Sequence, residues 1–113
     1  MNRLERRSAL RIDESLPFKI GHQGYDIEAR TVNISANGAM CRLERDIPVM
    51  TQLSVGLELP SAKRVCAKGV VVRSQKDLGS SCYLIAIYFN EIREKDQNLL
   101  QDYITSRIHG TSV

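Results

Sequence analysis

The sequence predicts an all-β domain that ends in one helix, and more narrowly a six-stranded antiparallel barrel. Six short apolar segments alternate with turn residues between residues 16 and 90. The links between these segments are too short for the crossover helices that parallel strands require. Near residue 95 the spacing of apolar residues changes from every second position to every third or fourth. A closed barrel is favoured over an open sandwich because closure removes exposed strand edges.

The expected strands differ in how clearly they alternate. The segment 51–59 alternates most cleanly, with leucine and valine on one face and small or polar residues on the other. In the second segment the apolar phase shifts to the other face, which indicates a bulge or bend near Arg30 or Thr31. The six strands are expected at residues 16–21, 25–34, 38–43, 51–59, 64–74 and 82–90.

The last part of the chain predicts a helix over about residues 95–109. Asp96 can serve as its N-cap or as an acidic residue of the first turn, and Gly110 follows as a stop signal. The apolar face of this helix must pack on the barrel or over one of its open ends. The stripe that forms this face consists of Leu99, Leu100, Tyr103, Ile104, Arg107 and Ile108.

The N-terminal segment 1–11 carries the whole positive charge of the chain. It holds four arginines against Glu5 alone, which equals the net charge of +3. Arginine presents a planar fork suited to phosphate and to base edges, although an ordinary solvated tail is the alternative. The 113 residues are expected to form a single domain: a flexible arginine-rich arm at 1–11, a barrel at 12–92 and a helix at 93–110.

Composition and motifs argue against an enzyme and against a membrane protein. No nucleophile elbow, zinc-protease motif or glycine-rich phosphate loop occurs. His22 and His109 are interpreted as surface residues and do not stand at metal-ligand spacing to any cysteine. We therefore expect no catalytic residue, no metal and no cofactor. No apolar run approaches the roughly 20 residues of a membrane helix, and no secretory signal is recognised, so a cytoplasmic location is expected.

Three cysteines occur in the chain, and none of them forms a CxxC pair. An odd number without such a pair favours a reduced chain over a disulfide scaffold. Each lies within an apolar segment, so all three are predicted to be small buried residues. They are Cys41, Cys66 and Cys82.

Two short motifs stand out from this background. The first is Arg7-x-x-x-Arg11, just before the first strand, and the second is Asn33-x-Ser35-x-x-Gly38, between the second and third strands. The second motif has a purely structural interpretation, because Asn-Gly between apolar residues favours a type I′ turn with positive φ. Ser35 could simply brace that turn, but the turn does not require Asn33.

In their order and spacing the two motifs resemble the signature of the PilZ domain family. The segment 68–73 is similar to the family's fifth strand and 85–89 to a later strand, although Ala86 stands where glycine is common. The resemblance implies a six-stranded barrel that binds cyclic di-GMP, a bacterial second messenger. It implies that Arg7 and Arg11 are the principal contacts and that Arg6 helps to hold a second, stacked ligand molecule.

The resemblance also assigns roles near the second motif. Asn33 and Ser35 would hydrogen-bond guanine or phosphate, and Gly38 would allow the turn and a close backbone approach. Arg73, on the fifth strand, could stack on a base or could be an ordinary solvated arginine.

The function that this resemblance implies is that of a receptor or adaptor. Binding would order the arginine arm across the barrel and present a new surface to a protein partner. A PilZ-like scaffold that binds proteins and no nucleotide is the alternative. A barrel that binds single-stranded nucleic acid is disfavoured, because the barrel itself is neutral and lacks tryptophan. Three of the four tyrosines are moreover expected in core segments: Tyr83, Tyr88 and Tyr103.

Overall fold

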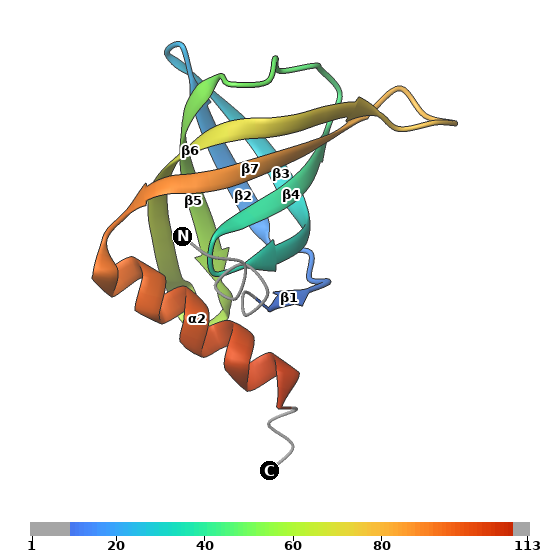
Figure 1. The fold of residues 1–113 in the computed structure, drawn as a ribbon. Helices are drawn as coiled ribbons and strands as arrows, with labels where there is room; N and C mark the ends of the chain where they lie inside the picture. Colours follow the sequence, from blue (N-terminus) through green and yellow to red (C-terminus); the bar gives the residue numbers. More distant parts are fainter. Residues whose placement is uncertain (1–9, 110–113) are drawn as a thin grey trace, which may run out of the picture.

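The structure, a computed structural model, describes residues 10–109 and is a closed antiparallel barrel with one helix packed against it (Figure 1). Arg6 and Arg7, the expected arm up to residue 9 and the stop signal Gly110 lie outside the described residues. The elements are β1 (Arg11–Ile12), β2 (Pro17–His22), β3 (Tyr25–Ser35), β4 (Gly38–Leu43), β5 (Gln52–Leu59), the short 3-10 helix η1 (Pro60–Ala62), β6 (Lys63–Lys76), β7 (Tyr83–Ile92) and α2 (Glu94–Ile108).

The order of strands around the wall confirms the predicted barrel. Neighbouring strands follow the order β1-β3-β2-β5-β6-β7-β4, and β3 also pairs with β4, which closes the sheet on itself. All pairings are antiparallel. Six strands make the wall, while the two-residue β1 adds to the end of β3. The sequence did not predict β1, because two residues are too short for an alternating pattern.

The barrel interior is filled by inward side chains from every wall strand. In β5 the predicted alternation is confirmed, because Leu53, Val55, Leu57 and Leu59 are all buried. Phe18 is the largest of the fully buried side chains. The remaining fully buried apolar residues of the core include Ile20, Ile34, Cys41, Val65, Val71 and Ile85.

The predicted irregularity in β3 is confirmed next to the expected position. The register between β3 and β4 shifts between Thr31 and Asn33, which marks a β-bulge. Only the part of β3 around and after this bulge, residues 31–35, pairs with β4. Among the described residues, the segment 25–30 therefore pairs with β2 alone and leaves its other edge open.

The left-handed hairpin turn lies at a different place from the one expected. Gln23 and Gly24, between β2 and β3, have φ of 51° and 84°, as a type I′ turn requires. Neither Asn37 nor Gly38 has a positive φ, so the predicted type I′ turn at that pair is wrong. Gly38 is the first residue of β4, and a Cβ there would overlap the carbonyl oxygen of Ile87 on β7. Close strand packing explains this glycine.

The predicted burial of the cysteines holds for one of three residues. Cys41 is buried in β4, whereas Cys82 is half-buried and Cys66 is exposed. Cys66 points outward because its neighbour Val65 occupies the inward position of β6. Burial raises the pKa of Cys41 to about 12. Within residues 10–109 no group of His, Cys, Asp and Glu side chains could hold a metal ion.

Helix α2 confirms the predicted C-terminal helix and lies across one end of the barrel wall (Figure 1). Its own residues Leu100 and Ile104 are buried on the face that packs against the barrel, and the helix contacts β6, β1 and β3. Asp96 lies in the first turn and accepts a hydrogen bond from Nε of Arg93 at 3.3 Å, while Arg93 itself occupies the N-cap position. No helix of the described chain has the length and apolar character needed to cross a membrane.

Candidate functional site

Strand β1 brings one residue of the first motif against the second motif. Arg11 pairs with Ser35 and Ile12 pairs with Ile34, so β1 runs along the end of β3. The Arg11 side chain is exposed and donates a hydrogen bond from Nη1 to Oδ1 of Asn33 at 2.9 Å. The last residue of the expected arm is thus already a strand residue. The structure joins the two motifs through their side chains.

The turn that follows β3 is organised by Ser35. Its hydroxyl accepts a hydrogen bond from the backbone N–H of Asn37 at 3.2 Å and lies 3.5 Å from the carbonyl oxygen of Gly38. Ser35 is 3% exposed, so its hydroxyl is largely occupied by the turn. The carbonyl of Asn37 in turn accepts a bond from the N–H of Phe89 at 2.8 Å. Ser35 therefore holds the motif in shape, as its structural interpretation predicted.

A small cavity of about 130 Å³ opens beside this turn. It lies on the outer wall of the barrel, where β4, β7 and β6 are neighbours. Its lining combines a cation and backbone groups of the motifs with apolar side chains of the wall. The lining residues are Arg11, Ser35, Asn37, Gly38, Ala39, Val72, Ala86, Ile87 and Tyr88.

Tyr88 and Val72 are the two exposed apolar side chains of the lining, and the sequence motifs did not identify them. Tyr88 was expected in the core but is 49% exposed, because Ile87 and Phe89 take the inward positions of β7. Strict alternation along β7 was the signal that could have found it. Val72 is 51% exposed because its neighbour Val71 takes the inward position of β6, and a bulge leaves Val72 without a partner between Val71 and Arg73. No local pattern predicts that bulge.

Two of the predicted site residues, Asn33 and Arg73, do not line this cavity. Asn33 is half-buried and reaches the cavity only through its bond to Arg11. Arg73 pairs with Ala86 of β7 and is exposed, but it is not part of the cavity lining. The cavity therefore contains Arg11, Ser35 and Gly38 of the predicted set.

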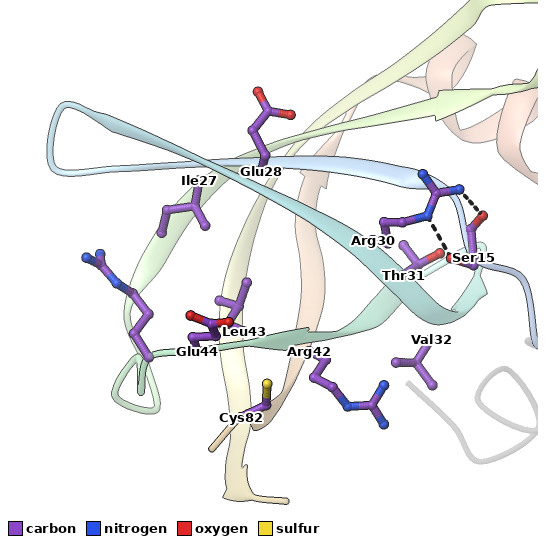
Figure 2. A pocket seen from close by; sticks show the side chains of 11 residues that line it. Ser15, Ile27, Glu28, Arg30, Thr31, Val32, Arg42, Leu43, Glu44 and Cys82 are labelled. Atoms are coloured by element: carbon purple, nitrogen blue, oxygen red, sulfur yellow. Dashed lines mark hydrogen bonds between the residues drawn. The ribbon is translucent and has the colours of Figure 1, made fainter. Parts of the chain in front are cut away.

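A larger cavity of about 780 Å³ lies elsewhere, in the gap between the open edge of β3 and the end of β4 (Figure 2). Arg30 at its rim donates hydrogen bonds to the hydroxyl and the carbonyl oxygens of Ser15, both at 2.9 Å. Arg42 donates to Oδ2 of Asp77 at 3.1 Å. Two of the arginines that line this cavity therefore already have hydrogen-bond partners. No residue of the two motifs lines the cavity.

Several solved structures have the same fold. The inhibitor of motility MotI/DgrA from Bacillus subtilis is 26% identical, with a TM-score of 0.83 over 97% of this chain and 55% of that one. YcgR from Escherichia coli, solved in complex with c-di-GMP, is 12% identical, with a TM-score of 0.78 over 95% and 48%. The MrkH–c-di-GMP complex from K. pneumonia is 18% identical, with a TM-score of 0.76 over 95% and 54%. The chain thus spans about half the length of these structures.

Sequence comparisons identify the family of the chain. No curated protein matches the chain significantly. The profile of the PilZ domain matches residues 5–106, which includes both motifs, every wall strand and most of α2. The chain therefore belongs to the PilZ domain family.

Proposed function

We propose that the protein is a receptor for cyclic di-GMP that changes conformation on binding and signals to a protein partner. The observation that carries this proposal is the hydrogen bond from Arg11 to Asn33 beside the cavity on the outer wall. This bond brings an exposed guanidinium of the first motif to the turn formed by the second. Family membership supports the proposal, as do the YcgR and MrkH structures solved with c-di-GMP.

The chemistry of the cavity suits a ligand that carries both phosphates and purines. The guanidinium of Arg11 can donate two parallel hydrogen bonds to a phosphate or to the Hoogsteen edge of guanine. The exposed ring of Tyr88 and the side chain of Val72 offer an apolar surface on which a base can lie. Gly38 lets β4 pack closely against Ile87 of β7, and this close packing shapes the wall of the cavity.

The residues outside the cavity complete the proposed site. Arg7 would be the second principal contact, and Arg6 would help to hold a second, stacked ligand molecule. Asn33 would exchange its bond to Arg11 for a bond to the ligand. Arg73 stays a candidate for stacking on a base, because its exposed side chain lies next to Val72. A bound phosphate would neutralise the positive charge of the arginines in the first motif, which favours ligand binding.

The proposed role is regulatory and cytoplasmic. No reaction is assigned to the site, because the proposed ligand is bound and not transformed. The changed arrangement of the arm on the barrel would form the surface that a protein partner recognises.

Isothermal titration calorimetry of the full chain with cyclic di-GMP tests the proposal. GTP, GMP and a single-stranded RNA serve as competing ligands. Saturable heat with cyclic di-GMP alone is the expected result. A folded protein that binds none of these ligands would support a PilZ scaffold for protein partners. Preferential binding of the RNA would support the nucleic-acid alternative.

A further inference from the structure

The segment 13–16 lies between β1 and β2 and is joined to α2 by three hydrogen bonds, all of them to the side chain of Glu14. Both carboxylate oxygens of Glu14 are occupied. Oε1 accepts a bond from the hydroxyl of Tyr103 at 3.0 Å. Oε2 accepts two bonds from Arg107, from Nε at 3.0 Å and from Nη2 at 2.7 Å. One carboxylate near the N-terminus thus joins two side chains near the end of the helix.

The carboxylate in these contacts is less exposed than the carboxylate of an ordinary surface ion pair. The side chain of Glu14 is 20% exposed, compared with 48% for Glu58 in its ion pair with Arg64. Burial and the bond to Glu14 raise the pKa of Tyr103, and the same carboxylate raises the pKa of Arg107. Partial burial limits solvent screening, so the Glu14 contacts contribute more than a fully exposed pair.

The same segment is fastened to β3 on its other side. The N–H of Leu16 donates to Oγ1 of Thr31 at 2.9 Å, and the N–H of Thr31 donates to the carbonyl of Leu16 at 3.0 Å. Ser15 accepts two bonds from Arg30, as Figure 2 shows. The segment therefore has little freedom to move independently of β3 and α2.

Glu14 lies only three positions after Arg11 in the chain. A chain of three residues spans at most about 10 Å, so a displacement of Glu14 also moves the backbone of Arg11. Helix α2 also contacts β1 directly. The side chain that meets the proposed ligand and the carboxylate that holds α2 thus lie on one short, anchored piece of backbone.

We infer that Glu14 is a positioning residue that holds Arg11 ready for the ligand and couples occupancy of the ligand site to α2. The inference rests on the proposed function. Without ligand, the bonds from α2 to Glu14 keep β1 paired along β3. Ligand binding stabilises this pairing further. Because Glu14 joins the same backbone to α2, the last turns of α2 are stabilised as well. Because coupling between two sites is reciprocal, weakening the α2 contacts must also weaken ligand binding.

The test compares amide hydrogen exchange of the full chain with and without saturating cyclic di-GMP. In the wild type, protection at residues 103–108 is expected to rise when the ligand binds. In Glu14→Ala this rise disappears and the Kd increases about five- to tenfold, at the low end of coupling between sites. Arg107→Gln removes the two bonds to Oε2 from the exposed side of α2 and leaves the bond from Tyr103, so it should reduce the rise in protection and the affinity in the same direction, by less than Glu14→Ala does.

Glu58→Ala is the matched control, because it removes an acid paired with Arg64 on the β5–β6 ladder. This control should behave as the wild type does. The inference is overturned, and the proposed function left intact, if α2 does not respond to ligand in a wild type that binds it. The same holds if α2 responds in Glu14→Ala and Arg107→Gln as strongly as in the wild type. A wild type that does not bind cyclic di-GMP overturns the proposed function and the inference together.

Discussion

Nη1 of Arg11 lies 2.9 Å from Oδ1 of Asn33 and donates a hydrogen bond to it, although the two residues are 22 positions apart. The bond joins the end of one sequence motif to the beginning of the other. Both groups are polar and accessible, so a ligand that uses them must replace this bond with its own. The site is therefore partly assembled before a ligand arrives.

Replacing Arg11 should separate binding from stability. Arg11→Ala removes one charge-assisted contact, which weakens binding of cyclic di-GMP by roughly ten- to a hundredfold. The melting temperature without ligand should hardly move, because the side chain is exposed. Calorimetric titration and thermal denaturation measure the two effects. Arg64→Ala, which removes another exposed arginine, should leave the affinity unchanged. A large loss of stability in Arg11→Ala would show that Arg11 is mainly structural.

Tyr88 should contribute to affinity through its ring. Tyr88→Ala removes an exposed aromatic surface beside the cavity and is expected to cost about 1–3 kcal/mol of binding, as for a base stacked on an aromatic residue. Tyr25 is also exposed, at 68%, but lies at the start of β3 and lines none of the described cavities. Tyr25→Ala is therefore the control in a fluorescence or calorimetric titration. Equal affinities of the two variants would exclude Tyr88 from the site.

Two glycines should respond differently to alanine. A Cβ at Gly38 would overlap the carbonyl oxygen of Ile87, so Gly38→Ala must push β4 away from β7. The expected loss of stability is about 1–3 kcal/mol, as for other overpacked positions. Gly24 has open space but a φ of 84°, so Gly24→Ala costs about 1–2 kcal/mol of backbone strain alone.

Ligand affinity distinguishes these two variants more sharply than their stability. Gly38→Ala should lower the affinity for cyclic di-GMP because it distorts the cavity wall, whereas Gly24→Ala should not. Chemical denaturation gives the stabilities and calorimetry gives the affinities. If Gly38→Ala were as stable as the wild type, the close approach of β4 to β7 would be refuted.

The cysteines should react with thiol reagents in the order of their exposure. Because the thiolate is the reactive form, a pKa of about 12 leaves roughly one Cys41 in 10⁴ ionised at pH 8. The exposed Cys66 is expected to be labelled rapidly under native conditions and Cys82 more slowly. Mass spectrometry of the labelled peptides, with and without denaturant, measures this order. Rapid native labelling of Cys41 would contradict its burial in β4.

The sequence predicted the fold well because apolar segments of strand length alternate with turn residues along the chain, and in β5 the inward and outward residues alternate without a break. Residues 38–43 were predicted with the bounds that β4 has, and the helix was predicted to within one residue at each end. The bulge in β3 was visible because it reverses the face of the apolar residues. Each of these features depends on neighbours along the chain, which a sequence displays directly.

The features that the sequence missed depend on contacts between distant segments. β1 exists because two residues reach the end of β3, which no local pattern encodes. Gly38 was attributed to turn geometry, whereas the carbonyl of Ile87, 49 positions later, explains it. Tyr88 was placed in the core because the whole apolar run was interpreted as buried, without separating its two faces. The candidate site was thus predicted through its motifs but not through its apolar wall.

The open edge of β3 has a consequence for how the protein behaves at high concentration. An unpaired strand edge is a template on which another molecule can add a strand, and such additions begin aggregation. Along residues 25–30 the charged Asp26, Glu28 and Arg30 alternate with Ile27 and Ala29. An incoming strand would have to place its own side chains against these charges. Substituting Asp26 and Glu28 with valine or threonine would keep the pairing of β3 with β2 but remove this protection, so the variant should aggregate more readily.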